Sequence, residues 1–417
     1  MSKYKIFGGR KLSGKIDVCA SKNASLPILA GSILCGKNVV LKNLPNFVDI
    51  FNMEKILTHL GAKIEKNDIF TKICTENLST YSIPATLTKS IRSSIFMLGP
   101  LLSKFKKAKI AFPGGCNIGN RPIDLHLKGL RALNCKINEE HGYLDCDGKN
   151  MKPSDIHLDF PSVGATENIM MAAVCLEGTT RIFNSAREPE IVDLQNFLNS
   201  FGAKIYGAGN SVIYIEGVKK LGDSVDYQPI SDRIIAGTYL IGGLICGGNV
   251  EICNVCPEHI YSLISKLKNS ACNLKVKNDK ICLEVNSRIN ALNVETMPYP
   301  GFPTDLQPQL VSLLSVANGT SIITENLFES RFKHIPELVK MGAKITVKDK
   351  IAIISGVENL SGAEVLSTDL RAGASLVLAG MNASGYTIVD GIEHINRGYE
   401  NLMNEFNSLN AHIELID

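Results

Sequence analysis

The chain lacks any apolar run long enough to cross a bilayer, so we expect no membrane insertion. Its first residues, MSKYKIF, also lack the apolar core of a secretory signal peptide. Its charge shows no strong bias, with 44 Lys and Arg against 41 Asp and Glu and a net charge of +3. This balance argues against nucleic-acid partners, and it means that any anionic ligand must be held by a local cluster of basic residues.

Disulfide scaffolding is also missing, because the 12 cysteines do not follow the close spacing of a small cross-linked domain. We therefore expect reduced thiols in a cytoplasmic protein. Most of them, for example Cys35, Cys175 and Cys246, are predicted to be small core side chains. The length of 417 residues exceeds what one core supports, so at least two domains are expected.

A four-residue pattern recurs along the chain: two small or polar residues, then Lys, then Ile or Val. Its six copies, two of them weaker, lie about 70 residues apart, which indicates an internal repeat. The third residue of each copy is Lys63, Lys136, Lys204, Lys275, Lys344 and His412.

Each copy has the same surroundings. A leucine-rich amphipathic stretch such as 335–341 precedes the pattern and predicts a helix, and a hairpin such as 344–354 follows it. Farther upstream lies an almost wholly apolar helix that ends at a glycine before a strand, as in 169–178, and such a helix must be buried on all sides. Six units of this kind predict two domains of three repeats.

The domain boundary is predicted at the Tyr227-Gln228-Pro229 link. The first domain then spans 22–229, and the second combines 230–417 with the strand-like residues 1–21, which we expect to complete it. The default ligand site is the cleft between the two domains.

The stretch 112–126 (FPGGCNIGNRPIDLH) places Cys116 in a glycine-rich loop with Arg121 five residues later. Glycines let the backbone approach a ligand closely. An arginine near a thiol stabilises the thiolate and can also hold an anion. The loop therefore predicts an acid or nucleophile beside an anion clamp, although an incidental cysteine in a surface turn has the same local pattern.

Seven motifs in order resemble the UDP-N-acetylglucosamine 1-carboxyvinyltransferases, the enolpyruvyl transferases of the first committed step of peptidoglycan synthesis. The resemblance covers essentially the whole chain. It rests on residues 21–24, 113–126, 161–168, 301–307, 329–332, 368–372 and 396–400.

This resemblance implies an α/β fold of two inside-out barrels, each of three repeats. The implied reaction joins phosphoenolpyruvate to the 3′-hydroxyl of UDP-N-acetylglucosamine by addition and elimination, and it releases phosphate. The substrates are small molecules, the chemistry needs no metal or cofactor, and the enzyme is expected in the cytoplasm. The sequence does not determine its oligomeric state.

The resemblance also implies roles for individual residues. Cys116 protonates carbon C3, closes with its loop as a lid and is the target of the epoxide fosfomycin, and Asp305 accepts or orients the 3′-hydroxyl. The cationic groups Lys22, Arg121 and Arg397 hold the phosphate and carboxylate. The other implied substrate contacts are Asn23, Arg92, Pro122, Ile123, Asp124, Leu125, Ser162, Val163, Gly164, Leu327, Arg331, Asp369 and Arg371.

Plainer interpretations stand beside these roles. Asp305 could simply cap the helix that follows, and Arg92 could lie on an ordinary helix face. Residues 31–38 nearly spell a phosphate-binding loop but have Asn38 where Ser or Thr should bind magnesium. Cys253, Cys256 and His259 lack the second ligand pair of a zinc site.

Three other functions remain open. The related 3-phosphoshikimate 1-carboxyvinyltransferase lacks the cysteine loop. A catalytically silent paralogue that binds nucleotide sugar would be expected to lose Cys116, Asp305 or Lys22. An RNA-end-processing ligase would need a catalytic histidine and a basic surface.

Overall fold

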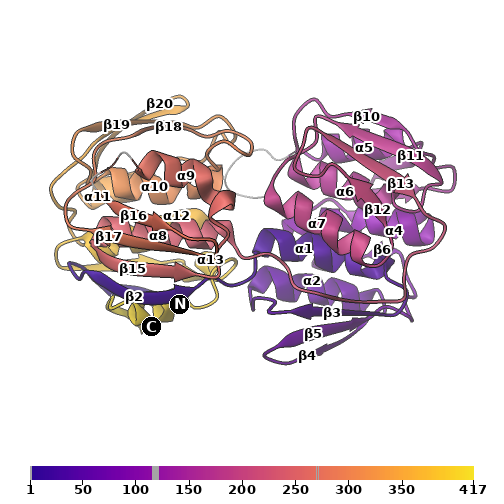
Figure 1. Cartoon of the computed structure of the whole chain (residues 1–417), viewed down its shortest axis with the longest axis horizontal. Coiled ribbons are helices and arrows are strands. Elements are labelled where there is room, and N and C mark those ends of the chain that lie inside the picture. The colour runs from indigo at the N-terminus through magenta and orange to yellow at the C-terminus, as the bar shows by residue number, and fades with distance from the viewer. Residues whose placement is uncertain (1, 115–121, 269, 271) are drawn as a thin grey trace. The chain divides into compact units, whose positions relative to one another are not determined.

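The computed structural model describes residues 2–114, 122–268, 270 and 272–417, which form two compact units. Among these residues, unit 2 runs from Ala20 to Ile230, and unit 1 combines residues 2–19 with Ser231–Asp417. Each unit has three four-stranded sheets outside and long apolar helices inside (Figure 1). The predicted α/β class is confirmed, and none of the described sheets closes into a barrel.

Each sheet is one copy of the repeat. In three of the six described sheets, a first strand leads through an inner helix to a second, parallel strand, and an outer helix then leads to a hairpin. The other three have the same strand arrangement, but one strand of each comes from a distant segment: Lys3–Phe7, Leu12–Asp17 or Ser224–Tyr227. A parallel pair needs such a helical crossover, whereas the hairpin strands pair antiparallel through a short turn.

In unit 2, the inner helices are α1 (Lys22–Gly31), α4 (Leu98–Phe105) and α6 (Val163–Ala173), and the outer helices are α2 (Val48–His59), α5 (Asp124–Ala132) and α7 (Pro189–Ser200). Short helices are η1 (Ser32–Leu34), α3 (Ala85–Thr88) and η2 (Arg92–Met97). The sheets, in order across each, are β14 (Ser224–Tyr227), β3 (Asn38–Lys42), β5 (Phe70–Cys74), β4 (Lys63–Lys66); β6 (Ser82–Ile83), β7 (Lys107–Ala111), β9 (Tyr143–Asp147), β8 (Lys136–Glu140); and β10 (Asp155–His157), β11 (Gly178–Phe183), β13 (Val212–Gly217), β12 (Lys204–Tyr206).

In unit 1, the inner helices are α8 (Arg233–Cys246), α10 (Gln307–Leu314) and α12 (Leu370–Asn382), and the outer helices are α9 (Tyr261–Leu267), α11 (Ile335–Lys340) and α14 (Leu402–Ser408). Short helices are η3 (Pro257–Ile260), η4 (Thr304–Leu306) and α13 (Ile392–Ile395). The sheets are β2 (Leu12–Asp17), β15 (Gly248–Cys253), β17 (Lys280–Val285), β16 (Asn273–Val276); β18 (Asn293–Glu295), β19 (Thr320–Thr324), β21 (Ile351–Ser355), β20 (Lys344–Lys348); and β22 (Glu364–Leu366), β23 (Tyr386–Asp390), β1 (Lys3–Phe7), β24 (Ile413–Ile416).

The two N-terminal strands belong to sheets of unit 1. Strand β2 pairs parallel with β15, and β1 pairs antiparallel with both β23 and β24. In unit 2, strand β14 lies at the edge of the first sheet and pairs parallel with β3. Each unit therefore contains a sheet that is built from strands of both ends of that unit's sequence.

The recurring pattern marks the turn between the outer helix and the hairpin. Its first residue takes a positive φ at Gly61, Gly202 and Gly342, and also at Asn134 and Asn410. Glycine adopts this left-handed conformation without a steric penalty, and asparagine tolerates it better than most residues. The pattern is therefore a helix stop that aims the chain into the next strand.

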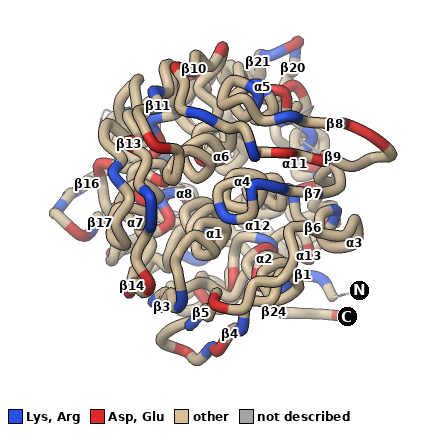
Figure 2. Tube along the Cα trace, turned by 90° about the vertical axis from the view of Figure 1, so that its right-hand side faces the viewer, with Lys and Arg blue, Asp and Glu red and all other residues tan. Residues whose placement is uncertain are grey.

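The inner helices are buried on all sides, as their apolar sequences predicted. In the charge-coloured trace, α1 and α6 are almost uncharged, whereas both signs are scattered over the outer strands and loops (Figure 2). The predicted end of one helix was wrong. Helix α6 ends at Ala173, residues 174–177 form a turn, and Gly178 begins strand β11.

No helix among the described residues is both long and apolar enough to cross a membrane. The described cysteines are free thiols, of which Cys35 is buried whereas Cys175 and Cys246 are half-buried. Cys253 ends strand β15, and no described group of His, Cys, Asp and Glu residues is arranged to hold a metal ion.

Candidate active site

Lys22 is the first residue of inner helix α1 in unit 2. Ser21 caps this helix, since its hydroxyl accepts a hydrogen bond from Ala24 N at 3.3 Å. The Lys22 ammonium lies 2.7 Å from a carboxylate oxygen of Asp49, in the first turn of α2, and both side chains are buried. Asn23 follows Lys22 and is half-buried. The sequence pattern missed Asp49, whose partner lies on a different helix.

Arg92 begins η2 and points to the segment that precedes the loop. Its guanidinium donates a hydrogen bond to Gly114 O at 3.3 Å. Gly114 passes so close to Lys89 that a side-chain Cβ there would lie 2.6 Å from the Lys89 carbonyl oxygen. The predicted residues Cys116 and Arg121 lie outside the described residues, so their roles stay predictions.

Two helix N-termini carry the residues expected to hold the nucleotide. Ile123 flanks α5, which begins at Asp124, while Ser162 caps α6, where its hydroxyl accepts from Ala165 N at 3.4 Å. The first backbone N–H groups of a helix suit an anion such as a diphosphate. The remaining predicted contacts here lie at the same two ends: Pro122, Leu125, Val163 and Gly164.

A buried histidine and asparagine hold these helix ends together. Asn168 donates its side-chain N–H groups to Ile95 O at 2.9 Å and to His126 Nδ1 at 2.7 Å, and its side-chain oxygen accepts from Gly99 N at 2.8 Å. Burial, with a smaller contribution from Arg92, lowers the pKa of His126 to about 3, so the ring is neutral and Nδ1 can accept. The side-chain amide of Asn168 thereby links η2, α4, α5 and α6.

Gly164 shows how tight this packing is. A Cβ at this position would lie 2.9 Å from a ring carbon of His126 and 3.0 Å from one of Phe96. A side chain at this position would press on the buried His126 ring, so Gly164 permits the close approach of α6 to α5.

In unit 1, Asp305 is held by two arginines. Its two carboxylate oxygens accept hydrogen bonds from Arg331 at 2.7 Å and from Arg371 at 3.0 Å, and both arginines are buried. Arg331 also donates to Thr304 O through Nε and Nη2. Asp305 stands in the first turn of η4, whereas the N-cap positions of η4 and α10 are Pro303 and Leu306.

Asp369 serves mainly as a helix cap. Its carboxylate accepts from the N–H groups of Arg371 and Ala372 at the start of α12. The same oxygen lies 4.0 Å from Arg331. The structure therefore brings four predicted site residues together in unit 1: Asp305, Arg331, Asp369 and Arg371.

Behind Arg371 lies a buried polar cluster that the sequence analysis did not assign. The Tyr399 hydroxyl receives Arg371 Nη1 at 3.4 Å and lies 2.8 Å from the Thr238 hydroxyl. Gln309 donates to both hydroxyls. Burial alone would lower the pKa of Arg371, but the charges of Asp305 and other neighbours raise it above its ordinary value. Arg371 is thus a fixed cation that holds Asp305.

Leu327 is tied to the same region through Glu325. The buried Glu325 carboxylate accepts from the hydroxyls of Thr296 and Thr304 and from the backbone N–H of Leu327. A backbone contact from Leu327 to a ligand would therefore use its carbonyl. Arg397 follows the short helix α13 and is half-buried, two residues before Tyr399.

The sequence analysis assigned no role to Asn168, Tyr399 and Asp49, although the sequence holds a signal for each of them. Tyr399 and Asn168 lie within motifs that were recognised, and Asp49 stands at the first turn of a predicted helix. None of them signals its partner, because each partner is distant in the sequence and, for Asn168 and in part for Tyr399, comes from another repeat.

Comparison with known proteins extends these observations. The family model of EPSP synthase (3-phosphoshikimate 1-carboxyvinyltransferase) matches residues 6–406. The chain is 51% identical over 414 residues to UDP-N-acetylglucosamine 1-carboxyvinyltransferase 2 of Caldanaerobacter subterraneus subsp. tengcongensis, covering 99% of each chain. It is 46% identical to UDP-N-acetylglucosamine 1-carboxyvinyltransferase 1 of Carboxydothermus hydrogenoformans, covering 100% of this chain and 99% of the relative.

Solved structures agree on the fold. The enolpyruvyl transferase NikO from Streptomyces tendae superposes with a TM-score of 0.90 at 24% identity, over 100% of this chain and 99% of the other. EPSP synthase from Acinetobacter baumannii gives a TM-score of 0.78 at 20% identity, over 100% of both chains.

Proposed function

This chain belongs to the enolpyruvyl transferase family that includes EPSP synthase, and from that premise we propose that it is a UDP-N-acetylglucosamine 1-carboxyvinyltransferase. It transfers the enolpyruvyl group of phosphoenolpyruvate to the 3′-hydroxyl of UDP-N-acetylglucosamine and releases phosphate, in the first committed step of peptidoglycan synthesis. The observation that carries the proposal is 51% identity to a relative of that name over 99% of both chains.

The alternative acceptor, shikimate 3-phosphate, is not favoured. The match to the EPSP synthase model is a family match, whereas the full-length relatives at 46–51% identity carry the nucleotide-sugar name. A silent paralogue is disfavoured because Cys116, Asp305 and Lys22 are all present.

The reaction adds the sugar hydroxyl to carbon C2 of phosphoenolpyruvate while carbon C3 takes a proton. The tetrahedral intermediate then loses a proton from C3 and expels phosphate, which restores the double bond. We assign Cys116 as the acid that protonates C3, on a loop that closes over the substrates. The same thiol would be alkylated by fosfomycin.

We assign Asp305 to the acceptor hydroxyl. Both of its oxygens already accept from an arginine, so the carboxylate is fixed in one orientation before the substrate arrives. Fixed acceptors contribute to catalysis because no reorganisation is needed when charge develops. Arg331 and Arg371, which were predicted to face phosphoenolpyruvate, are better assigned as the groups that hold Asp305.

We assign Lys22, Arg121 and Arg397 to the phosphate and carboxylate of phosphoenolpyruvate. Lys22 is already paired with Asp49 in a buried site, so its ammonium is held in position and its charge is partly offset. Arg92 donates a hydrogen bond to Gly114 O, directly before the loop that carries Cys116. The position of its guanidinium would therefore depend on the position of that loop.

The nucleotide would lie at the N-termini of α5 and α6, where Ile123 to Leu125 and Ser162 to Gly164 offer backbone N–H groups and Pro122 lies beside them. Asn23 and the Leu327 carbonyl would contact the sugar. A cytoplasmic location follows from this proposal, because both substrates are charged metabolites that do not cross a bilayer unaided.

Phosphate release from phosphoenolpyruvate tests the proposal. We expect release by the wild-type chain that requires UDP-N-acetylglucosamine and is lost in Cys116→Ala. Release that is independent of the nucleotide sugar, or unchanged release by Cys116→Ala, would contradict the substrate or the acid, respectively.

A further inference from the structure

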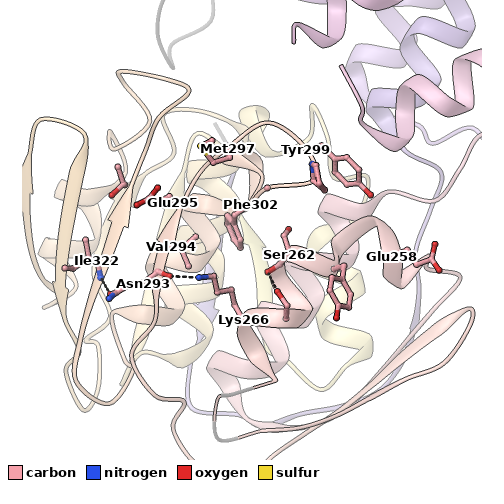
Figure 3. Close-up of a pocket in the computed structure, with 15 residues that line it drawn as sticks. Glu258, Ser262, Lys266, Asn293, Val294, Glu295, Met297, Tyr299, Phe302 and Ile322 are labelled. Carbon is pink, nitrogen blue, oxygen red and sulfur yellow. Dashed lines mark hydrogen bonds between the residues drawn. The ribbon is translucent and has the colours of Figure 1, made fainter. Parts of the chain in front are cut away.

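Two cavities lined by described residues differ in how their polar groups are used. The larger, of about 790 Å³, lies in unit 1 between α9 and β18. There the Lys266 ammonium donates to Asn293 O at 2.9 Å, and Ile322 N donates to the Asn293 side chain at 3.0 Å (Figure 3). Thr296 and Phe302 also form a backbone bridge. Because the chain itself uses these groups, the cavity in unit 1 indicates no particular ligand.

The second cavity, of about 510 Å³, lies in unit 2 at the C-terminal ends of the inner helices. It is lined by Leu34 in η1, which follows α1, by Lys104 in the last turn of α4 and by Glu177 after α6. Lys22 and Ser162, in contrast, stand at the N-terminal ends of α1 and α6. The length of α1, about 15 Å at 1.5 Å per residue, therefore separates this cavity from the proposed substrate site.

Three lysines line this cavity from two separate segments. Lys104 lies in the last turn of α4, and Lys106 ends that helix in the left-handed conformation. Lys219 lies in the linker between β13 and β14. This linker is attached to the end of α6, since Val218 N donates to Val174 O at 2.8 Å. The fold itself therefore gathers the three side chains around one cavity.

The three ammonium groups are unpaired. None of them forms an ion pair or donates a hydrogen bond within the part of the chain that the structure describes. Asp223, in the same linker, pairs with Lys220 at 3.5 Å instead. Glu177 lines the cavity but forms no ion pair with any described residue. Like charges repel one another, so an anion bound among the three lysines would offset their repulsion.

An inner-helix end in unit 1 shows a different use of a cation. Arg288, in the linker between β17 and β18, donates to Val316 O at 2.9 Å and to Ala317 O at 3.2 Å, just after α10. It also donates to Val357 O at 2.7 Å. Basic side chains often bind the last carbonyl groups of a helix in this way. The three lysines of unit 2 form no such bond within the described residues, so hydrogen-bonded capping does not explain them.

A buried hydroxyl is a second, independent feature of this cavity. Ser103 is only 6% exposed and lines the cavity, and its hydroxyl has no hydrogen-bond partner among the described residues. A buried hydroxyl without a partner costs free energy, which an acceptor on a ligand would recover. A phosphate group offers several strong acceptor oxygens and pairs well with lysine ammonium groups.

We propose that this cavity binds a small phosphomonoester whose organic part carries hydroxyl groups. The phosphate oxygens accept hydrogen bonds from the ammonium groups of Lys104, Lys106 and Lys219 and from the hydroxyl of Ser103. The volume is in the range of small-ligand sites and leaves room for the organic part beside the phosphate. Glu177 accepts a hydrogen bond from a ligand hydroxyl and disfavours a second anionic group.

Isothermal titration calorimetry with glucose 6-phosphate tests this site in the full-length protein. Glucose, which lacks the phosphate, is the matched control ligand. We expect saturable binding of glucose 6-phosphate and no binding of glucose at the same concentrations. The affinity should fall as the salt concentration rises, because salt screens the charges of the lysines.

A matched pair of double variants locates the binding. Lys104→Gln with Lys219→Gln removes two of the three cations and should weaken binding about tenfold or more. Lys42→Gln with Lys72→Gln removes the same charge from β3 and β5, in the first sheet of unit 2, and should leave binding unchanged. Phosphate release should be equal in both, because none of these lysines belongs to the proposed substrate site.

Ser103→Ala tests the hydroxyl separately. The substitution removes an unpaired buried group, so the melting temperature should not fall, whereas binding of glucose 6-phosphate should weaken about fivefold. A structural role for Ser103 would instead lower the melting temperature.

Four results would overturn the proposal: no saturable binding of glucose 6-phosphate, equal binding of glucose, equal binding by Lys104→Gln with Lys219→Gln, or equal binding by Ser103→Ala. The first two use the unmodified protein, so they decide the question even if a variant does not fold. Failure of this site would leave the proposed enzymatic function untouched.

Discussion

Units 1 and 2 share one repeat plan but carry different chemistry at the N-terminal ends of their inner helices. In unit 1, a carboxylate, Asp305, is held by two buried arginines, of which Arg371 also bonds to Tyr399. In unit 2, a lysine, Lys22, is held by one buried carboxylate, and a neutral histidine packs under the helix ends. The same scaffold thus presents an anion in one unit and a cation in the other.

This difference shows how two units of the same fold can carry the groups for two different substrates. A group that handles a hydroxyl proton must be an acceptor, whereas a group that holds phosphate must be a cation. In the proposed assignment each unit supplies one of them, and in the structure each is paired with a buried counter-ion. The predictions below test this division.

The largest expected effect is that of replacing Cys116, in the glycine-rich stretch 112–126. Cys116→Asp should retain turnover, because aspartic acid can also donate a proton, and it should abolish inactivation by fosfomycin, because the nucleophilic sulfur is gone. The measurement is residual activity after incubation with fosfomycin. Continued inactivation would remove Cys116 as the target.

The second prediction concerns the anion of unit 1. Asp305→Ala should lower turnover by roughly two to four orders of magnitude, the usual contribution of a positioned acid–base group, while both substrates still bind. Calorimetric titration and phosphate release measure the two properties, and Asp226→Ala, an exposed aspartate in unit 2, is the control. Near-normal turnover would reduce Asp305 to a structural residue.

The third prediction concerns the cation of unit 2. Lys22→Ala leaves the buried Asp49 carboxylate without its ammonium, so the free energy of unfolding should fall by about 3–5 kcal/mol. In the double variant Lys22→Met with Asp49→Asn, most of this loss should be recovered, because no charge remains buried. Urea denaturation measures both, and equal losses in the two variants would show that the pair is not the cause.

The smallest effect is a pH dependence in unit 2. The folded pKa of His126 is lowered from 6.5 to about 3, so the unfolded chain binds more protons between these values. Stability should therefore fall as pH decreases below about 6.5, by up to about 1.4 kcal/mol per pH unit from this residue. His126→Asn keeps an acceptor for Asn168 and should flatten this part of the curve.

Thermal unfolding from pH 7 to pH 4 measures the difference between wild type and His126→Asn. Other shifted groups stay in both proteins and contribute equally to both curves: His334, whose pKa burial lowers to about 4, and Asp193, whose pKa burial raises to about 6. Identical curves would mean that His126 is not neutral in the folded chain.

Much of the fold was predictable because its signals are local. The helix stop at Gly61 and its equivalents needs a residue that tolerates a positive φ, so the repeat is visible in the sequence. The N-terminal residues are strand-like in sequence, and they form β1 and β2, which pair with β23 and β15. The end of α6 was misplaced because an apolar run does not show where helix gives way to turn.

The site was predictable only in its residue types. The sequence motifs named Asp305, Arg331 and Arg371, but they did not indicate that the two arginines hold the carboxylate. Asn168 and Tyr399 lie in recognised motifs, yet His126, the partner of Asn168, and Thr238 and Gln309, two partners of Tyr399, come from other repeats. Such pairings depend on how three repeats pack together, which no short stretch of sequence encodes.

One experiment tests the central assignment most directly. Phosphoenolpyruvate is mixed with equal concentrations of UDP-N-acetylglucosamine and shikimate 3-phosphate, and mass spectrometry follows both acceptors while phosphate is measured. Our account predicts that only the nucleotide sugar gains the mass of one enolpyruvyl group, in step with phosphate. Gain by shikimate 3-phosphate, or by neither acceptor, would contradict it.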